Sequence, residues 1–98
     1  MLKTKVVIKR PNVREKHLPP NEKGQKVYGL AYPTSFKVYI DPRQDSYEYL
    51  NTCIHEMLHC FLPDLEEPPI RKLADLMTQE IWARKYRRIN KIKKIKLN

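Results

Sequence analysis

The chain has 98 residues, of which 20 are Lys or Arg and 11 are Asp or Glu, so its formal net charge at pH 7 is +9. This length predicts one small domain with a thin hydrophobic core, to whose stability a bound metal ion can contribute. No apolar run reaches about 18 residues and the N-terminus lacks the long apolar region of a signal peptide, which excludes a transmembrane helix and predicts a cytoplasmic protein.

Three short strands are predicted in the first half of the chain. In Leu2–Lys9, apolar and β-branched residues alternate with lysines, a period of two that is typical of a strand. The polar segment Pro11–Gly24 follows as a connection with turn signals. Lys26–Tyr32 and Phe36–Ile40 are the second and third strands, and the short link between them predicts a hairpin. Gly29, inside the second strand, predicts a bulge or a close approach of the backbone to another element.

Two helices are predicted in the second half. The first begins at Asp45-Ser46, where an acidic N-cap is favoured, and ends at Pro63. The second begins at Pro68-Pro69, because proline is tolerated in the first helical turn. The link between them is short, so the two helices are expected to pack as antiparallel neighbours. The predicted fold class is therefore α+β, with three strands and two helices.

The first helix carries the motif His55-Glu56-Met57-Leu58-His59, of the form H-E-x-x-H. Residues four apart lie on one face of a helix, about 6 Å apart along its axis, so both imidazoles can bind one zinc ion (Zn²⁺). Glu56 lies next to that ion and is placed to act as the general base of a zinc peptidase. The alternative is a pair of hydrogen-bonded core histidines beside a surface glutamate.

A catalytic zinc ion usually has three protein ligands and one open position. We expect the third ligand to come from the link or from the start of the second helix, which returns past His59. Glu67 is the first candidate, because its side chain is long enough to reach back from the helix start. Asp64, Glu66 and Asp75 are the alternatives, and each acidic group can instead compensate the helix dipole.

The two cysteines, Cys53 and Cys60, are seven residues apart on the first helix. Their separation of about 10 Å along the axis is too long for a disulfide. We expect both to be small buried hydrophobic residues. Cys60 follows His59 directly, but it points the wrong way round the helix to join the metal.

The order of these segments resembles the minimal zincin metallopeptidases of bacteria and their phages, SprT-like proteins included. The resemblance covers about Val27–Trp82 and is carried by G-L-A-Y-P-T-S-F-K-V-Y-I-D-P, by Y-E-Y-L-N-T-C-I-H-E-M-L-H, and by D-L-E-E before a helix that ends in I-W. It implies a mixed sheet packed on the active-site helix, and zinc-dependent hydrolysis of peptide bonds. It also implies that His55 and His59 are ligands, that Glu56 is the base, and that an edge strand, here Phe36–Ile40, holds the extended substrate.

The chain departs from this family pattern in one respect. SprT-like proteins have a third histidine after the motif, and none follows His59 here. An acidic third ligand such as Glu67 is typical of the gluzincin type instead.

We predict a metallopeptidase domain over residues 1–83 and a basic helical extension over residues 84–98. The extension contains eight cations and no acid: Arg84, Lys85, Arg87, Arg88, Lys91, Lys93, Lys94 and Lys96. Isoleucines recur there every three residues, so the segment can prolong the second helix. Either Arg84–Lys96 binds nucleic-acid phosphates without sequence specificity, or its cations form a solvated helix end that suits the dipole.

Three functions agree with these features. The favoured one is a zinc metallopeptidase acting on protein or peptide substrates, with no membrane contact. The second is a non-catalytic module stabilised by zinc that binds nucleic acid or an acidic partner through its basic tail; a closed four-ligand site, for example with Cys60, would favour it. The third is a peptidase recruited to nucleic acid by the same tail.

Overall fold

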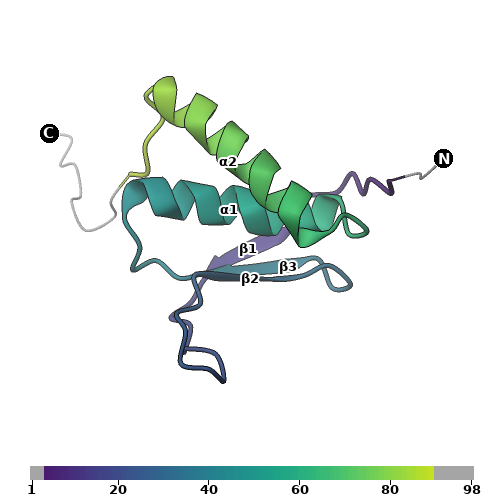
Figure 1. The fold of residues 1–98 in the computed structure, drawn as a ribbon, viewed down its shortest axis with the longest axis horizontal. Helices are drawn as coiled ribbons and strands as arrows, with labels where there is room; N and C mark the ends of the chain where they lie inside the picture. The colour runs from purple at the N-terminus through teal and green to yellow at the C-terminus, as the bar shows by residue number, and fades with distance from the viewer. Residues whose placement is uncertain (1–3, 90–98) are drawn as a thin grey trace, which may run out of the picture.

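The computed structural model describes residues 4–89, which form three strands followed by two helices (Figure 1). The elements are β1 (Asn12–Glu15), β2 (Gly29–Tyr32), β3 (Lys37–Ile40), α1 (Ser46–Phe61) and α2 (Glu67–Ala83). The predicted α+β class is confirmed.

The three strands form one mixed sheet in the order β1-β3-β2. β1 pairs with β3 in parallel, and β2 pairs with β3 antiparallel as the predicted hairpin. α1 packs on one face of this sheet and α2 packs on α1, so both helices lie on the same side (Figure 1). The strand at Phe36–Ile40 is therefore central, and its prediction as the edge strand that holds a substrate is wrong.

The predicted strand at Leu2–Lys9 is also wrong for its described part. Residues 4–11 belong to no strand, and β1 lies instead at Asn12–Glu15, inside the segment expected to be a connection. The backbone N–H of Val7 donates to the carbonyl of Phe61 at the end of α1, 2.8 Å away. Val7 thus packs against α1 and the core, whereas Val6 and Ile8 stay exposed, an arrangement that their alternation alone does not distinguish from a strand.

The hairpin strands are shorter than predicted. β2 begins at Gly29 instead of Lys26, and β3 begins at Lys37 because Phe36 has a left-handed backbone with φ of 57°. This conformation is unfavourable for a residue with a side chain. It turns the ring of Phe36 into the core, where its centroid lies 6.4 Å from that of Phe61.

Both helix starts agree with the sequence prediction. The side chain of Asp45 caps α1 by accepting the N–H of Glu48 at 2.9 Å, and two prolines lie in the first turn of α2. The core has two parts. Between α1 and the sheet, it contains Phe36, Val38, Ile40 and Cys60. Between the helices, it contains Ile54, Leu58, Ile70 and Ala74.

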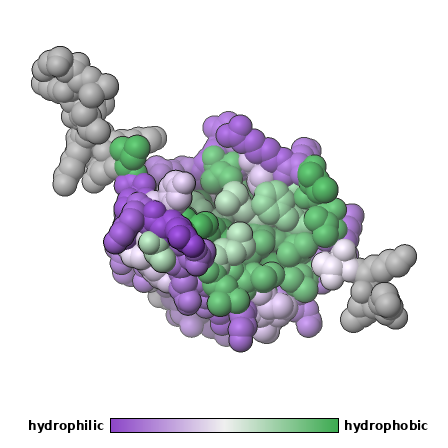
Figure 2. Space-filling view, turned by 90° about the horizontal axis from the view of Figure 1, so that it is seen from above, coloured by the Kyte–Doolittle hydropathy of each residue, from purple (hydrophilic) through white to green (hydrophobic). Residues whose placement is uncertain are grey.

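The face formed by the helices is apolar over a broad area, as Figure 2 shows from above. The exposed apolar side chains of the described residues include Leu73, Leu76 and Met77 of α2. An apolar groove of about 730 Å³ also lies between Val6–Ile8 and the side of α1 that carries Met57. Neither helix of the described residues has the length and apolar content needed to cross a membrane.

The chain leaves the helical conformation after α2. Arg84 is the C-cap and Lys85 has a left-handed φ of 73°, so the predicted helical extension is wrong for residues 84–89. The guanidinium of Arg87 stacks on Trp82, 3.5 Å from the ring centroid, and the chain then turns back toward α1. The remainder of the predicted basic tail, residues 90–98, lies outside the described residues, and the boundary between 83 and 84 stays a prediction.

Candidate metal centre

His55 and His59 of α1 and Glu67 of α2 converge at the junction of the two helices. The Nε2 atom of His59 lies 2.8 Å from Glu67 Oε1, and the Nε2 atom of His55 lies 3.0 Å from Glu67 Oε2. The ring centroids of the two histidines are 5.0 Å apart. One ligand atom from each of the three residues lies within 4.8 Å of the other two. The cluster is therefore close enough to hold a metal ion.

The short connection between the helices places Glu67 there. α1 ends at Phe61 and α2 begins at Glu67, so the first turn of α2 lies beside the last turn of α1. Leu62 and Leu65 of the connection pack into the core between the helices and fix its path. Glu66 takes the N-cap position with an extended backbone, which turns the next side chain back toward the histidines.

The donor set is of a kind that can hold a divalent metal ion. The imidazole nitrogens lie 2.8–3.3 Å from the Glu67 oxygens, and the three ligand atoms all lie within 4.8 Å of one another. Imidazole nitrogens and carboxylate oxygens are ligands of several divalent metals.

The other acidic candidates lie elsewhere. Asp75 faces α1 about two turns further along α2 and accepts a hydrogen bond from Asn51 Nδ2 at 3.0 Å. Asp64 and Glu66 are exposed and outside the cluster. Cys60 is fully buried against the sheet, so it cannot be the fourth ligand of a closed site.

The electrostatics of the cluster favour the neutral form of the His55 imidazole. Burial lowers the pKa of His55, and although Glu67 acts in the opposite direction, the net shift is downward. The neutral form of histidine is the one that binds metals. Arg71 Nη2 lies 3.2 Å from Glu67 Oε2 and supports the charge of this carboxylate.

Glu56 lies in the cleft next to His55. Burial raises the pKa of its carboxyl group to about 7, and the negative charge of Glu67 adds to this effect. A carboxylate with a pKa near neutrality is a stronger base than an ordinary glutamate and remains partly ionised at pH 7.

Gly29 brings the backbone of β2 into direct contact with α1 beside Glu56. A Cβ atom at this position would lie 2.6 Å from Thr52 Cγ2 and 2.8 Å from Glu56 Cγ. Both distances are too short for non-bonded carbon atoms. The glycine expected to mark a close approach therefore does so, and it sets the distance between the β2 strand and the carboxylate.

A cleft of about 350 Å³ runs between this strand and α1. One wall is formed by Lys26–Gly29 and the other by α1 residues. The residues of the α1 wall are Glu48, Asn51, Thr52, His55 and Glu56. Of the three candidate metal ligands, His55 is the one that lines this cleft.

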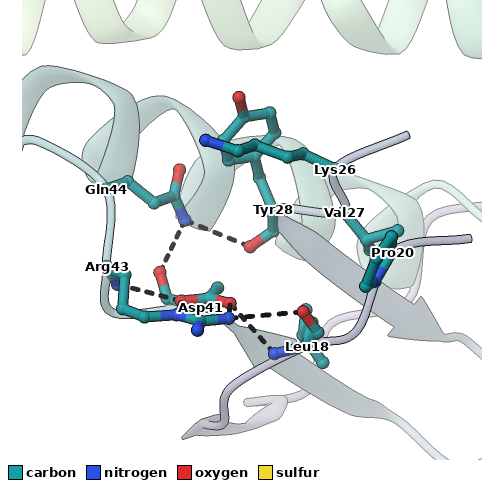
Figure 3. A pocket seen from close by; sticks show the side chains of 8 residues that line it. All are labelled: Leu18, Pro20, Lys26, Val27, Tyr28, Asp41, Arg43 and Gln44. Atoms are coloured by element: carbon teal, nitrogen blue, oxygen red, sulfur yellow. Dashed lines mark hydrogen bonds and ion pairs between the residues drawn. The ribbon is translucent and has the colours of Figure 1, made fainter. Parts of the chain in front are cut away.

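A polar network fixes the segment before β2 (Figure 3). Asp41 accepts hydrogen bonds from the N–H of Leu18 at 2.9 Å and from Arg43 Nη2 at 2.7 Å. Gln44 Nε2 donates to the carbonyls of Tyr28 and Asp41 at 3.1 and 2.8 Å (Figure 3). The Arg43 side chain holds the pKa of Asp41 well below its ordinary value.

The network also reaches the cleft wall. Thr52 of α1 donates its hydroxyl hydrogen to Gln44 Oε1 at 2.8 Å. The pocket around Asp41 shares Lys26, Val27 and Tyr28 with the cleft but contains neither histidine. It therefore positions the cleft and does not belong to the candidate metal centre. The sequence assigned no role to Asp41 or Gln44.

Comparisons with protein-family models, with curated proteins and with solved structures find no match to this chain. The fold and the site define a small α+β domain with three side chains arranged to hold a metal ion.

Proposed function

We propose that the protein is a zinc-dependent metallopeptidase of the zincin type. The observation that carries the proposal is the convergence of His55, His59 and Glu67, with Glu56 in the adjoining cleft. A structural zinc site is closed by four protein ligands, whereas a catalytic site leaves one position for water and substrate. Three ligands are brought together among the described residues, which favours catalysis over a structural role.

In this mechanism the two imidazoles and Glu67 hold the metal ion. When bound, zinc supplies Lewis-acid chemistry: it polarises a carbonyl group and lowers the pKa of a coordinated water. Glu56 takes a proton from the attacking water and passes it to the amine of the departing peptide. Its raised pKa suits both steps, because the group must accept a proton and then release it near neutral pH.

β2 is the strand that we propose to hold the substrate, in place of the central strand β3. The N–H of Asp41 donates to the carbonyl of Tyr28 at 2.9 Å, so these two residues form a hydrogen-bonded pair. Alternation along an antiparallel strand then directs the backbone groups of Gly29 and Ala31 away from β3. An extended peptide that pairs with them lies over Glu56, because Gly29 touches that side chain.

The test combines metal analysis with proteolysis of an unstructured protein such as casein. Glu56→Gln is expected to retain zinc and lose hydrolysis, while His59→Ala loses both. Glu48→Gln is the matched control, because Glu48 is a glutamate of the same helix and lines the same cleft. Undiminished cleavage by the Glu56→Gln variant, or purified protein that retains no zinc, would refute the proposal.

A further inference from the structure

The face of the sheet opposite the helices carries an uncommon set of side chains. Side chains alternate between the two faces of a strand, and the buried Val38 and Ile40 of β3 point toward α1. The strand register therefore places six residues on the other side, which we name the outer sheet face. They are Asn12, Arg14, Leu30, Tyr32, Lys37 and Tyr39.

Two tyrosines form the centre of the outer sheet face. Tyr32 and Tyr39 lie on neighbouring strands with ring centroids 6.0 Å apart and planes at 78°. The side chain of Tyr32 is 48% exposed, and that of Leu30 beside it is 37% exposed. Both helices lie on the opposite side of the sheet (Figure 1), so no element of the described residues packs over these rings.

Cations surround the two rings. Arg14 and Lys37 occupy outward positions on β1 and β3, and Lys16 Nζ lies 5.4 Å from the ring centroid of Tyr39. None of the ion pairs of residues 4–89 involves these three side chains. The six outward positions contain no acid. The nearest acidic residue by sequence is Glu15, between Arg14 and Lys16, and its side chain lies on the α1 side of the sheet, where it pairs with Arg88.

The three described arginines after α2 are engaged differently. Arg84 pairs with Glu80 at 2.7 Å, and Arg87 stacks on Trp82. Arg88 pairs with Glu15 at 3.1 Å and lies over the ring of Tyr49. Phosphates that bound these arginines would have to displace existing partners, whereas Arg14 and Lys37 of the outer sheet face take part in none of the ion pairs of residues 4–89.

We propose that the outer sheet face binds single-stranded nucleic acid. Exposed aromatic rings on a sheet stack with unpaired bases, and cations at the rim neutralise the phosphates between them. The exposed ring of Tyr32 provides the stacking position for a base, and the partly buried ring of Tyr39 lies edge-on beside it. A polyglutamate-like peptide would use the cations but has no flat side chain to stack on this ring, so the exposed aromatic ring favours nucleic acid. This inference does not depend on the peptidase activity.

The test measures binding of a labelled oligothymidylate of about 12 nucleotides by fluorescence anisotropy, with an oligouridylate and a duplex of equal length. Single strands are expected to bind more tightly than the duplex, because bases in a duplex are already stacked. Tighter binding of the oligouridylate than of the oligothymidylate would assign RNA as the ligand, and the reverse would assign DNA.

Variants locate the binding site in the full chain. Tyr32→Ala is expected to weaken binding about tenfold or more, and Tyr32→Phe to retain it. Tyr86→Ala is the matched control, because Tyr86 is 69% exposed and lies after α2. Lys37→Gln is expected to reduce the slope of log affinity against log salt by about 0.7, whereas Lys72→Gln on α2 leaves it unchanged.

Equal thermal stability of the variants, checked by circular dichroism, ensures that the comparison reports binding. Affinity that Tyr32→Ala and Lys37→Gln leave unchanged would overturn the proposal, as would equal affinity for single strands and duplex. Displacement of the oligonucleotide by polyglutamate, together with no effect of Tyr32→Ala, would also overturn it and make the face a surface for an acidic protein.

Discussion

Replacing Gly29 with alanine tests the contact between β2 and the α1 residue proposed as the base. The new Cβ would lie 2.6 Å from Thr52 Cγ2 and 2.8 Å from Glu56 Cγ, so strand and helix must move apart by several tenths of an ångström. Overpacking of this kind costs about 1–3 kcal/mol. For a domain of this size, each kcal/mol lowers the melting temperature by about 4–8 °C.

The same displacement is expected to slow hydrolysis. A shift of about 1 Å in a reacting group can cost on the order of a hundredfold in rate, so a smaller shift of Glu56 predicts a loss of about tenfold in kcat/KM. The assays are thermal unfolding of the metal-free protein and casein cleavage with zinc present.

Thr52→Ser separates the two contacts made by the new methyl group. Serine removes Cγ2 but keeps the hydroxyl that donates to Gln44. In the Thr52→Ser variant, Gly29→Ala is expected to cost less stability than it does in the unmodified chain. The loss in kcat/KM is expected to persist, because the contact of the new Cβ with Glu56 remains. A double-mutant cycle measures this coupling. If Gly29→Ala leaves both melting temperature and rate unchanged, the close approach of β2 to α1 is refuted.

Three further predictions concern stability. The depressed pKa of Asp41 means that the folded state binds its proton less readily than the unfolded state. The stability that ionised Asp41 contributes is thus fully present well above pH 3.8, the ordinary pKa of the group. It is lost as the pH falls below this value. Asp41→Asn is expected to cost on the order of 2 kcal/mol at pH 7 and less at pH 3, as denaturant titrations would measure. Zinc at about 1,000 times its dissociation constant is expected to stabilise the fold by about 4 kcal/mol, an increase that chelation and His59→Ala both abolish in thermal scans. Arg88→Ala is expected to cost about 1–2 kcal/mol in urea titrations, because it removes an ion pair with Glu15 and a contact with the Tyr49 ring, whereas Lys85→Ala is the control that leaves stability unchanged.

The features that the sequence predicted well depend on local chemistry. The side chain of Asp45 caps α1 by accepting the N–H of Glu48, three residues later in the chain. The two prolines of α2 lie in its first turn. Glu67 was the first candidate for the third ligand because its side chain is long enough to reach back from the start of the second helix. The short connection between the helices places it beside both imidazoles.

The features that the sequence did not predict depend on distant pairings. β1 has the polar sequence N-V-R-E and is recognised as a strand only through its partner β3, which lies more than 20 residues away. Strand order is likewise a property of the whole sheet, so the central place of Lys37–Ile40 was not visible in its own residues. The role of Gln44 depends on contacts with two separate segments and has no local signature.

The return of the chain after α2 decides where the molecule can be shortened. Ala83 is the last helical residue and would be an obvious C-terminus for a shorter fragment. However, the side chain of Arg88 pairs with Glu15 of β1, donates to the carbonyl of Pro42 and lies over the Tyr49 ring of α1. A fragment ending at residue 83 would leave Glu15 without its cation and the ring of Trp82 uncovered. The smallest recombinant fragment that preserves the described architecture therefore extends at least through Arg88.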